Sequence, residues 1–170
     1  ELNLGLEIKT EMPSKLGQDR LINASAAFHE YQTSLIIIDC GTATTLDVVT
    51  AEGIFSGGII CPGLLISAEV LFSKAAQLFQ VNLEMPANII GENTTDSMKS
   101  GLIYGYGGMI DSLIKKLADE LVLQGQNSPK VVITGGLATK ILPILSNVIY
   151  HDDLTLRGLS LFYELNKKNI

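Results

Sequence analysis

The residues most suited to chemistry in this sequence stand where a short apolar run ends in an aspartate. Residues 34–47 read SLIIIDCGTATTLD, so Asp39 follows the apolar run, and Gly41 and Thr42 come shortly after it. Glycine lets a backbone approach a ligand closely, successive N–H groups bind anions, and threonine hydroxyls add donors and acceptors. The segment is therefore typical of a turn that holds phosphate and a metal ion, although a hairpin with a polar turn accounts for it equally well.

Two further segments contain residues of the same kind. Residues 17–23 read GQDRLIN, and residues 134–138 read TGGLA. Taken by itself, Asp19 is a good N-cap for a helix over residues 21–28. A glycine pair at a strand end, as in residues 134–138, permits close backbone approach to a ligand but also suits an ordinary strand-to-helix turn.

The elements that must position these residues follow from hydrophobic periodicity. Continuous or alternating apolar runs predict strands, and apolar residues at steps of three and four predict helices. We expect strands at 35–39, 44–50, 54–61, 130–134 and 148–150, helices at 21–28, 64–76, 93–123, 137–145 and 154–166, and a strand-like or irregular segment at 1–12. In the strand expected at 54–61, Gly57 and Gly58 predict either a bulge or a close approach of a ligand. Three consecutive strands form a meander, and later strands join through helical crossovers, which is the plan of an α/β ribonuclease H-like domain with a mixed sheet.

The bulk composition argues against several classes of protein. The chain has 170 residues, of which 46% are hydrophobic and 18% charged, as in a globular domain with a sizeable core. A net charge of −6 argues against a nucleic-acid partner, and no apolar run approaches the ~20 residues of a membrane helix. Cys40 and Cys61 lack metal-ligand spacing and lie in apolar runs. We therefore expect reduced core thiols in a cytoplasmic protein with no membrane partner.

Taken together and in order, these segments resemble the type III pantothenate kinase family, whose members are also described as Bvg accessory factor-type proteins. Residues 17–23 are similar to the family's pantothenate motif, Gly-x-Asp-Arg-x-x-Asn, and residues 39–45 to its second phosphate motif. Residues 57–63, 91–94 and 153–159 also match family segments, so the resemblance covers nearly the whole chain. It implies the ribonuclease H-like fold of the acetate and sugar kinase, Hsp70 and actin superfamily, whose members are actin-like ATPases.

The resemblance implies transfer of a phosphoryl group from ATP, with Mg²⁺, to the terminal hydroxyl of pantothenate, the first step towards coenzyme A. In that reaction Asp19 is the general base, and Asp39 binds a monovalent cation, K⁺ or NH₄⁺. The other implied contacts with pantothenate are made by Gly17, Gln18, Arg20 and Thr94, and those with ATP by Gly41, Thr42, Thr44, Gly135 and Gly136. The family is dimeric, with its pantothenate pocket at the dimer interface, so we expect a homodimer.

Several residues also have an ordinary structural explanation. Arg20 suits a surface ion pair as well as a substrate contact, and Asn23 suits a structural hydrogen bond as well as a positioning role. Thr94 is equally suited to capping the long helix, and Thr44 to forming a strand. Asp47 either supports the site or lies on the solvent-facing side of its strand.

One feature of the family is absent. The first phosphate motif, of the type Asp-x-Gly-Asn-Thr, has no match in the sequence, and the chain begins with Glu1 rather than methionine. We therefore expect residues 1–33 to be a lead-in that carries the pantothenate motif and a helix. Residues 34–170 are then the second ribonuclease H-like domain of a longer protein. Two other functions stay open: a kinase of the same superfamily for another small hydroxylated substrate, and a non-catalytic regulatory protein of the same fold.

Overall fold

A computed structural model describes residues 3–75 and 77–167 of the chain. Within these residues six strands form one sheet in the order β1-β4-β3-β2-β5-β6. The strands are β1 (Glu7–Ile8), β2 (Leu35–Cys40), β3 (Ala43–Val49), β4 (Ile54–Pro62), β5 (Lys130–Thr134) and β6 (Val148–Tyr150). β2, β3 and β4 form an antiparallel meander, β5 and β6 extend it in parallel from β2, and β1 pairs in parallel with β4. This arrangement confirms the predicted α/β fold with a mixed sheet.

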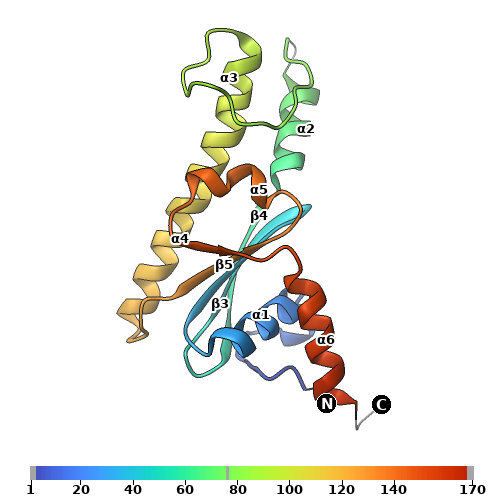
Figure 1. Ribbon diagram of the computed structural model, residues 1–170, viewed down its shortest axis with the longest axis vertical. Helices are drawn as coiled ribbons and strands as arrows, with labels where there is room; N and C mark the ends of the chain where they lie inside the picture. The colour runs from blue at the N-terminus through green and yellow to red at the C-terminus, as the bar shows by residue number, and fades with distance from the viewer. Residues whose placement is uncertain (1–2, 76, 168–170) are drawn as a thin grey trace.

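Helices cover both faces of the sheet (Figure 1). They are α1 (Gln18–Tyr31), α2 (Leu64–Lys74), α3 (Thr94–Ser100), α4 (Tyr106–Leu123), α5 (Ala138–Ile141) and α6 (Leu154–Asn166), with 3₁₀ turns at Pro13–Lys15 and Leu142–Ile144. α1 and α6 pack against each other and share one apolar layer, whereas α2, α4 and α5 contribute to the layer on the other face. Figure 1 shows that α2 and α3 project beyond the sheet, away from α1 and α6.

Strand β2 lies in the middle of the sheet and is buried on both faces. Ile36 and Ile38 pack in the layer of α2, α4 and α5, whereas Leu35 and Ile37 pack in the layer of α1 and α6. All four are at most 1% exposed. Burial on both faces explains why this strand is a continuous apolar run and not an alternating one. The strand therefore carries Asp39, which follows these four residues and is half-buried, to the edge of a closed core.

The long helix expected over residues 93–123 is one helical run that contains a π turn. α3 is followed by the π turn η2 (Gly101–Gly105), which leads directly into α4. The N-cap is Asn93, whose side chain accepts a hydrogen bond from the Asp96 backbone N–H at 2.9 Å. A capping role for Thr94 is therefore wrong, because Thr94 occupies the first helical position and is exposed.

Some expected elements differ in extent. Among residues 3–12 of the segment expected to be strand-like or irregular, the paired residues are the two of β1, and residues 1–2 lie outside the described part of the chain. The helix expected at 137–145 is divided into α5 and a 3₁₀ turn that contains Pro143, because proline lacks the N–H that would continue an α-helix. The bulge predicted at Gly57 and Gly58 is confirmed by a register shift between β3 and β4, and Gly57 has a φ of 110°.

The lead-in packs on the same sheet as the rest of the chain. β1 extends the sheet beside β4, and α1 packs on α6. Asn166, near the end of α6, accepts a hydrogen bond from the Asn3 backbone N–H at 2.7 Å and donates one to the Asn3 carbonyl at 2.8 Å. These contacts join residues 3–33 to the others, and the domain division after residue 33 stays a prediction.

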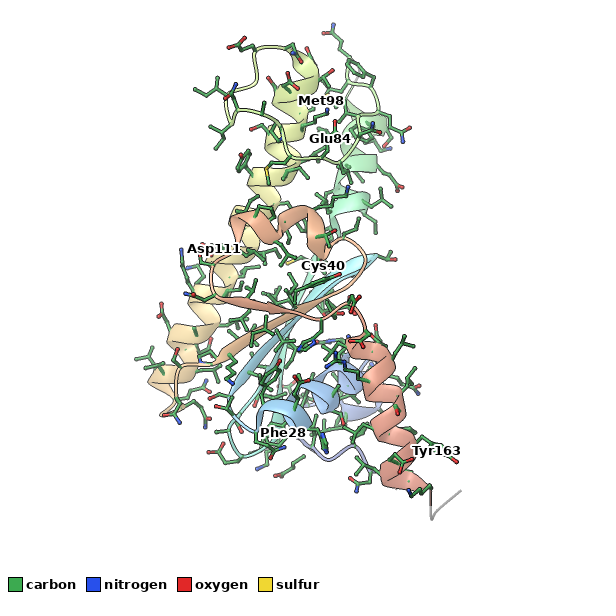
Figure 2. All side chains as sticks on the ribbon, viewed as in Figure 1. Phe28, Cys40, Glu84, Met98, Asp111 and Tyr163 are labelled. Carbon is green, nitrogen blue, oxygen red and sulfur yellow. The ribbon has the colours of Figure 1, made fainter. Side chains whose placement is uncertain are left out.

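Both cysteines are free thiols, as predicted. Cys40 lies near the centre of the molecule (Figure 2) and is 2% exposed, whereas Cys61 is half-buried, so the expected position in the core is confirmed for Cys40 and wrong for Cys61. Burial raises the pKa of the Cys40 thiol to about 12. Cys40 is therefore a neutral packing group and not a nucleophile.

Candidate active site

Strand β2 delivers the carboxylate of Asp39 to a position beside helix α1. The Asn23 side chain on α1 donates from Nδ2 to Asp39 Oδ2 at 3.0 Å. Burial raises the pKa of Asp39, the Asn23 hydrogen bond opposes this rise, and the negative charges of Asp19 and Asp47 add to it. Negative charge therefore gathers at this end of β2, where a bound cation would be stabilised.

Asp19 lies in the first turn of α1, but it is not the N-cap of that helix. Gly17 holds the N-cap position, so the expectation that Asp19 caps the helix is wrong. Within the described residues the Asp19 carboxylate has no hydrogen-bond or ion-pair partner, and both Asp19 and Gln18 are exposed. The carboxylate folds back over Gly17, since a Cβ built there would lie 2.6 Å from Asp19 Oδ1. A glycine at position 17 thus leaves room for a carboxylate that is free to contact a ligand.

Arg20 and Asp47 form an ion pair that is almost wholly buried. Arg20 Nε donates to Asp47 Oδ1 at 2.9 Å, a second guanidinium nitrogen contacts the same oxygen, and Thr45 Oγ1 donates to Asp47 Oδ2 at 3.3 Å. The Arg20 and Asp47 side chains are 12% and 2% exposed. Burial raises the pKa of Asp47, and the Arg20 guanidinium opposes that rise. The solvent-facing alternative for Asp47 is therefore wrong, and the ion pair considered for Arg20 lies in the interior and not at the surface.

Thr42 and Thr44, at the turn between β2 and β3, differ in their exposure to solvent. The Gly41 N–H closes the turn on the Ala43 carbonyl at 3.1 Å, whereas Thr42 is exposed at the tip. Thr44 is buried, and its Oγ1 accepts a hydrogen bond from the Tyr106 hydroxyl on α4 at 2.5 Å. Thr42 is therefore placed to meet a ligand, while Thr44 holds the turn against α4.

The glycine pair after β5 lies against the end of β2. A Cβ built on Gly135 would lie 2.6 Å from both Asp39 Oδ1 and the Cys40 backbone nitrogen, and its φ of 96° favours glycine. Gly136 is exposed, and a Cβ there would meet nothing within 4 Å. The Leu137 N–H donates to the Cys40 carbonyl at 3.2 Å, which ties the two turns together. The backbone at Gly136 is thus open to a ligand beside Asp39.

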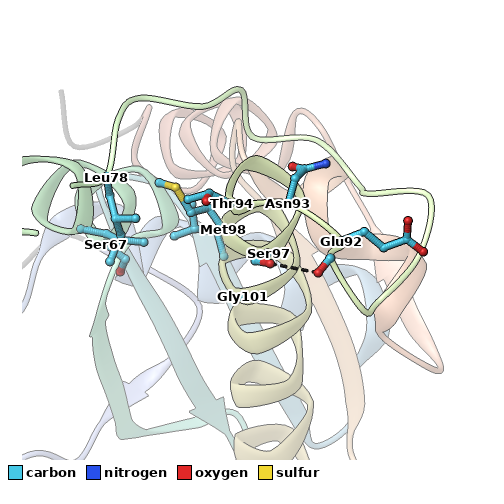
Figure 3. Close-up of a pocket in the computed structure, with 11 residues that line it drawn as sticks. Ser67, Leu78, Glu92, Asn93, Thr94, Ser97, Met98 and Gly101 are labelled. Atoms are coloured by element: carbon cyan, nitrogen blue, oxygen red, sulfur yellow. Dashed lines mark hydrogen bonds between the residues drawn. The ribbon is translucent and has the colours of Figure 1, made fainter.

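Thr94 lies elsewhere, in a pocket between α2, the segment that precedes α3, and α3 itself (Figure 3). The pocket has a volume of about 690 Å³, and its lining includes Met98, Leu102 and the Ser97 hydroxyl, which donates to the Gly91 carbonyl at 3.2 Å. The residues that line it include neither the Asp19 carboxylate nor the end of β2. Within one copy of the described chain, Thr94 is therefore not brought to the other predicted site residues.

The donor atoms at the end of β2 suit a cation of low charge. Across residues 3–75 and 77–167, no three His, Cys, Asp or Glu side chains come together as a metal cluster would require. Asp39 supplies one carboxylate oxygen, Oδ1, that carries no hydrogen bond from the described residues and lies against the Gly135 backbone. This carboxylate oxygen is a hard donor of the kind that binds a hard cation.

Sequence reasoning missed several contacts that hold the site together. It left Asp47 undecided and assigned no role to Tyr106 or Thr155, although the Thr155 hydroxyl donates to Asn23 Oδ1 at 2.7 Å. Thr155 lies in the segment 153–159, whose match to the family was the only signal that pointed to it. These partners are far apart in sequence, so local patterns do not reveal them.

Comparison with known proteins places the chain in a family. A family model described as "Type III pantothenate kinase" matches residues 1–116. A curated protein of Citrifermentans bemidjiense, named "Type III pantothenate kinase", is 43% identical over 167 residues, which is 98% of this chain and 64% of that protein. The chain therefore spans less than two thirds of the length of this relative.

A solved structure shares the fold. The Campylobacter jejuni protein titled "conserved putative Baf family transcriptional activator" superposes with a TM-score of 0.58 at 21% identity, over 98% of this chain and 71% of that one. At this identity the likeness concerns the fold alone. Among the described residues no helix is both long enough and apolar enough to cross a membrane.

Proposed function

Because this chain belongs to the type III pantothenate kinase family, we propose that the protein containing it transfers the γ-phosphoryl group of ATP to the terminal hydroxyl of pantothenate. The observation that supports this most is the Asp19 carboxylate, which is exposed and without a partner in the described chain. Phosphoryl transfer needs little covalent help from a protein, but it does need a group that orients the attacking hydroxyl. Asp19 is the general base of the proposed reaction, which is the first step towards coenzyme A.

The nucleotide is proposed to lie along the turns that follow β2 and β5. Thr42 offers an exposed hydroxyl, and Gly136 offers an open backbone, while Gly41 and Gly135 shape the two turns. Thr44 acts by anchoring the first turn, because its buried hydroxyl accepts a hydrogen bond from Tyr106 and is not offered to the nucleotide. Mg²⁺ bound to ATP would neutralise charge on the phosphates. Asp39 is the proposed ligand of K⁺ or NH₄⁺.

Pantothenate is proposed to bind beside the first turn of α1, next to Gly17, Gln18 and Arg20. The ion pair with Asp47 uses one edge of the Arg20 guanidinium and leaves its remaining N–H groups for the substrate. Because Thr94 lies in a separate pocket, we propose that it reaches the substrate of a second copy in a homodimer. Two free thiols suit a reducing compartment, and we place the enzyme in the cytoplasm.

One further function has an observation in its favour. The Campylobacter jejuni protein of the same fold carries a title that describes a transcriptional activator. A regulatory protein of this fold that bound DNA directly would usually need a basic surface, whereas this chain has a net charge of −6. A regulatory role would therefore act through another protein.

The direct test is a substrate panel with the full-length protein. ADP release is measured with Mg²⁺ and K⁺ in the presence of pantothenate, glucose or glycerate, and the phosphorylated product is identified by ³¹P NMR. We expect turnover with pantothenate only and a phosphate monoester on its terminal hydroxyl. Turnover with another acceptor would indicate a different kinase of the superfamily, and no turnover with any acceptor would favour the regulatory role.

A further inference from the structure

The Asn23 side chain connects Asp39 to a residue that the proposed reaction does not yet use. Asn23 is 1% exposed. Its Nδ2 donates to Asp39 Oδ2 at 3.0 Å, and its Oδ1 accepts a hydrogen bond from Thr155 Oγ1 at 2.7 Å. The neighbouring elements α1 and β2 are thereby joined to the distant helix α6 by one chain of side-chain hydrogen bonds.

The Asp39 carboxylate determines which way the Asn23 amide faces, and the Thr155 hydroxyl holds the amide in that orientation. An amide has two donors on nitrogen and an acceptor oxygen, and a carboxylate only accepts. The NH₂ group must face Asp39, because the opposite orientation would place the amide oxygen against a carboxylate oxygen, and Oδ1 is then left to accept from the Thr155 hydroxyl. Without the hydroxyl, the buried Asn23 carbonyl would have no partner among the described residues, which is unfavourable and leaves the position of the amide less firmly held.

The start of α6 is built to hold Thr155 in place. Leu154 is 0% exposed in the layer shared with α1. Gly158, one turn after Thr155, lies where the two helices touch, since a Cβ there would be 2.4 Å from the Ile22 carbonyl oxygen. Residues three apart on a helix share one face. The segment 153–159 thus sets the distance between Thr155 and Asn23.

The orientation of Asn23 in turn orients the Asp39 carboxylate. Because Oδ2 is held by Asn23, Oδ1 is turned towards the glycine turns, where a Cβ on Gly135 would lie 2.6 Å away and one on Gly41 would lie 3.6 Å away. We propose that Thr155 is a positioning residue: through Asn23 it fixes Asp39 with one oxygen free to bind the monovalent cation. This inference rests on the cation role proposed for Asp39.

The test compares variants of the full-length protein by cation binding without turnover. Tl⁺, a substitute for K⁺, is titrated calorimetrically into protein that holds a non-hydrolysable ATP analogue and no pantothenate. We expect Thr155→Val to weaken Tl⁺ binding roughly tenfold, as loss of a group that orients a metal ligand usually does. Thr155→Ser, which keeps the hydroxyl, should restore the parent affinity. In turnover, Thr155→Val should raise the K⁺ concentration for half-maximal activity and leave the KM for pantothenate unchanged.

A stability control separates positioning from simple destabilisation. Leu35→Val removes a methylene at the opposite end of β2, in the same apolar layer as Leu154, and should lower the Tm without changing Tl⁺ affinity. Thr155→Ala is the second variant if Thr155→Val does not fold, because alanine has a higher helix propensity than valine. It should weaken Tl⁺ binding in the same way.

Three results would overturn the inference. The first is a Thr155→Val or Thr155→Ala protein that loses stability but binds Tl⁺ like the parent. The second is a Thr155→Ser protein that binds as weakly as Thr155→Val. The third is a parent that binds no Tl⁺, which removes the cation site itself. A parent that binds Tl⁺ but does not phosphorylate pantothenate would contradict the proposed function alone, and the variants would still test the hydrogen-bond chain.

Discussion

Three carboxylates near the end of β2 differ in how many hydrogen-bond and ion-pair partners the protein gives them. Asp47 is paired with Arg20 and bonded to Thr45, Asp39 has one oxygen bonded to Asn23, and Asp19 has no partner in the described chain. A carboxylate that is fully paired inside a protein serves the structure, whereas one left free at the surface of a site can act on a ligand. At the scale of the residue, the number of partners therefore distinguishes the three roles. Asp47 supports the structure, Asp39 is the proposed cation ligand and Asp19 is the proposed base.

The charge on Asp39 is expected to cost the protein stability until a cation binds. Its pKa is raised by burial, so the folded protein binds this proton more tightly than the unfolded chain does. Its contribution to stability is therefore lost as the pH rises from the ordinary value of 3.8 through the raised pKa. In buffer without K⁺ or NH₄⁺, Asp39→Asn should have a higher free energy of unfolding than the parent at neutral pH. The difference in unfolding free energy between the two proteins should shrink as the pH falls below the ordinary carboxyl pKa of 3.8.

Urea unfolding across the pH range measures this difference. Asp119→Asn, which removes one carboxylate at an exposed position on α4, is the matched control. A parent that is more stable than Asp39→Asn at neutral pH without cation would show that the carboxylate is already compensated within the protein.

At the scale of the element, the site depends on how α1 crosses α6. Gly158 lets the two helices approach so closely that its missing Cβ would lie 2.4 Å from the Ile22 carbonyl oxygen. Asn23, the next residue of α1, meets Thr155 at this crossing. The crossing therefore fixes both the packing of α1 and the position of the motif that begins it.

Gly158→Ala should force the two helices apart. Overpacking against backbone atoms costs about 2 kcal/mol, which exceeds the gain in helix propensity of about 1 kcal/mol. Chemical denaturation should therefore give a lower free energy of unfolding, whereas Leu156→Ala, at a position 69% exposed on the same helix, should change it by less than about 0.5 kcal/mol. An unchanged or higher stability for Gly158→Ala would mean that the helices are not in close contact.

The elements themselves were largely predictable from the sequence, and the side-chain partners were not. The runs that form β2, β3, β4, β5 and α6 are local patterns of apolar residues, so their periodicity predicts them. The hydrogen bond between Thr155 and Asn23 joins residues 132 apart, and the ion pair of Arg20 with Asp47 depends on where α1 lies on the sheet. Such contacts follow from tertiary packing, which a local pattern does not specify.

The capping assignments failed for a local reason. Asp19 and Thr94 are both good N-cap types, but Gly17 and Asn93 hold those positions one or two residues earlier. Helix ends are the least specified part of a periodic pattern, because neighbouring polar residues are nearly equivalent as caps. The correction matters for function, since it leaves the Asp19 side chain without a structural task at the helix start.

At the scale of the whole molecule, the predicted site residues lie in two places. The ends of β2 and β5 and the start of α1 form one group, and Thr94 lies in a pocket on the projecting helices α2 and α3 (Figure 1). Along the same helical run Gly101, Gly105 and Gly108 are exposed, with open space where side chains would be. A homodimer that brings this surface to the first group of a second copy would complete the pantothenate pocket.

Mixed dimers test whether Thr94 acts across such an interface. If it does, Asp19→Asn and Thr94→Tyr proteins should each be inactive alone, but a dimer of one with the other contains one intact site. After subunit exchange, random pairing should recover about a quarter of the parent activity. Recovery should not occur when Asp19→Asn is mixed with the double variant that carries both changes. No recovery in the first mixture would place Thr94 in the same copy as its Asp19, or outside the site.

The most direct test of the central claim is the kcat of Asp19→Asn in the full-length protein, with pantothenate, ATP, Mg²⁺ and K⁺. Asparagine keeps the shape of the side chain but cannot accept the proton, so we expect kcat to fall by about 10²-fold or more. The KM values should change little. Asp119→Asn should retain the parent kcat. An Asp19→Asn protein that turns over like the parent would contradict the assignment of Asp19 as the base.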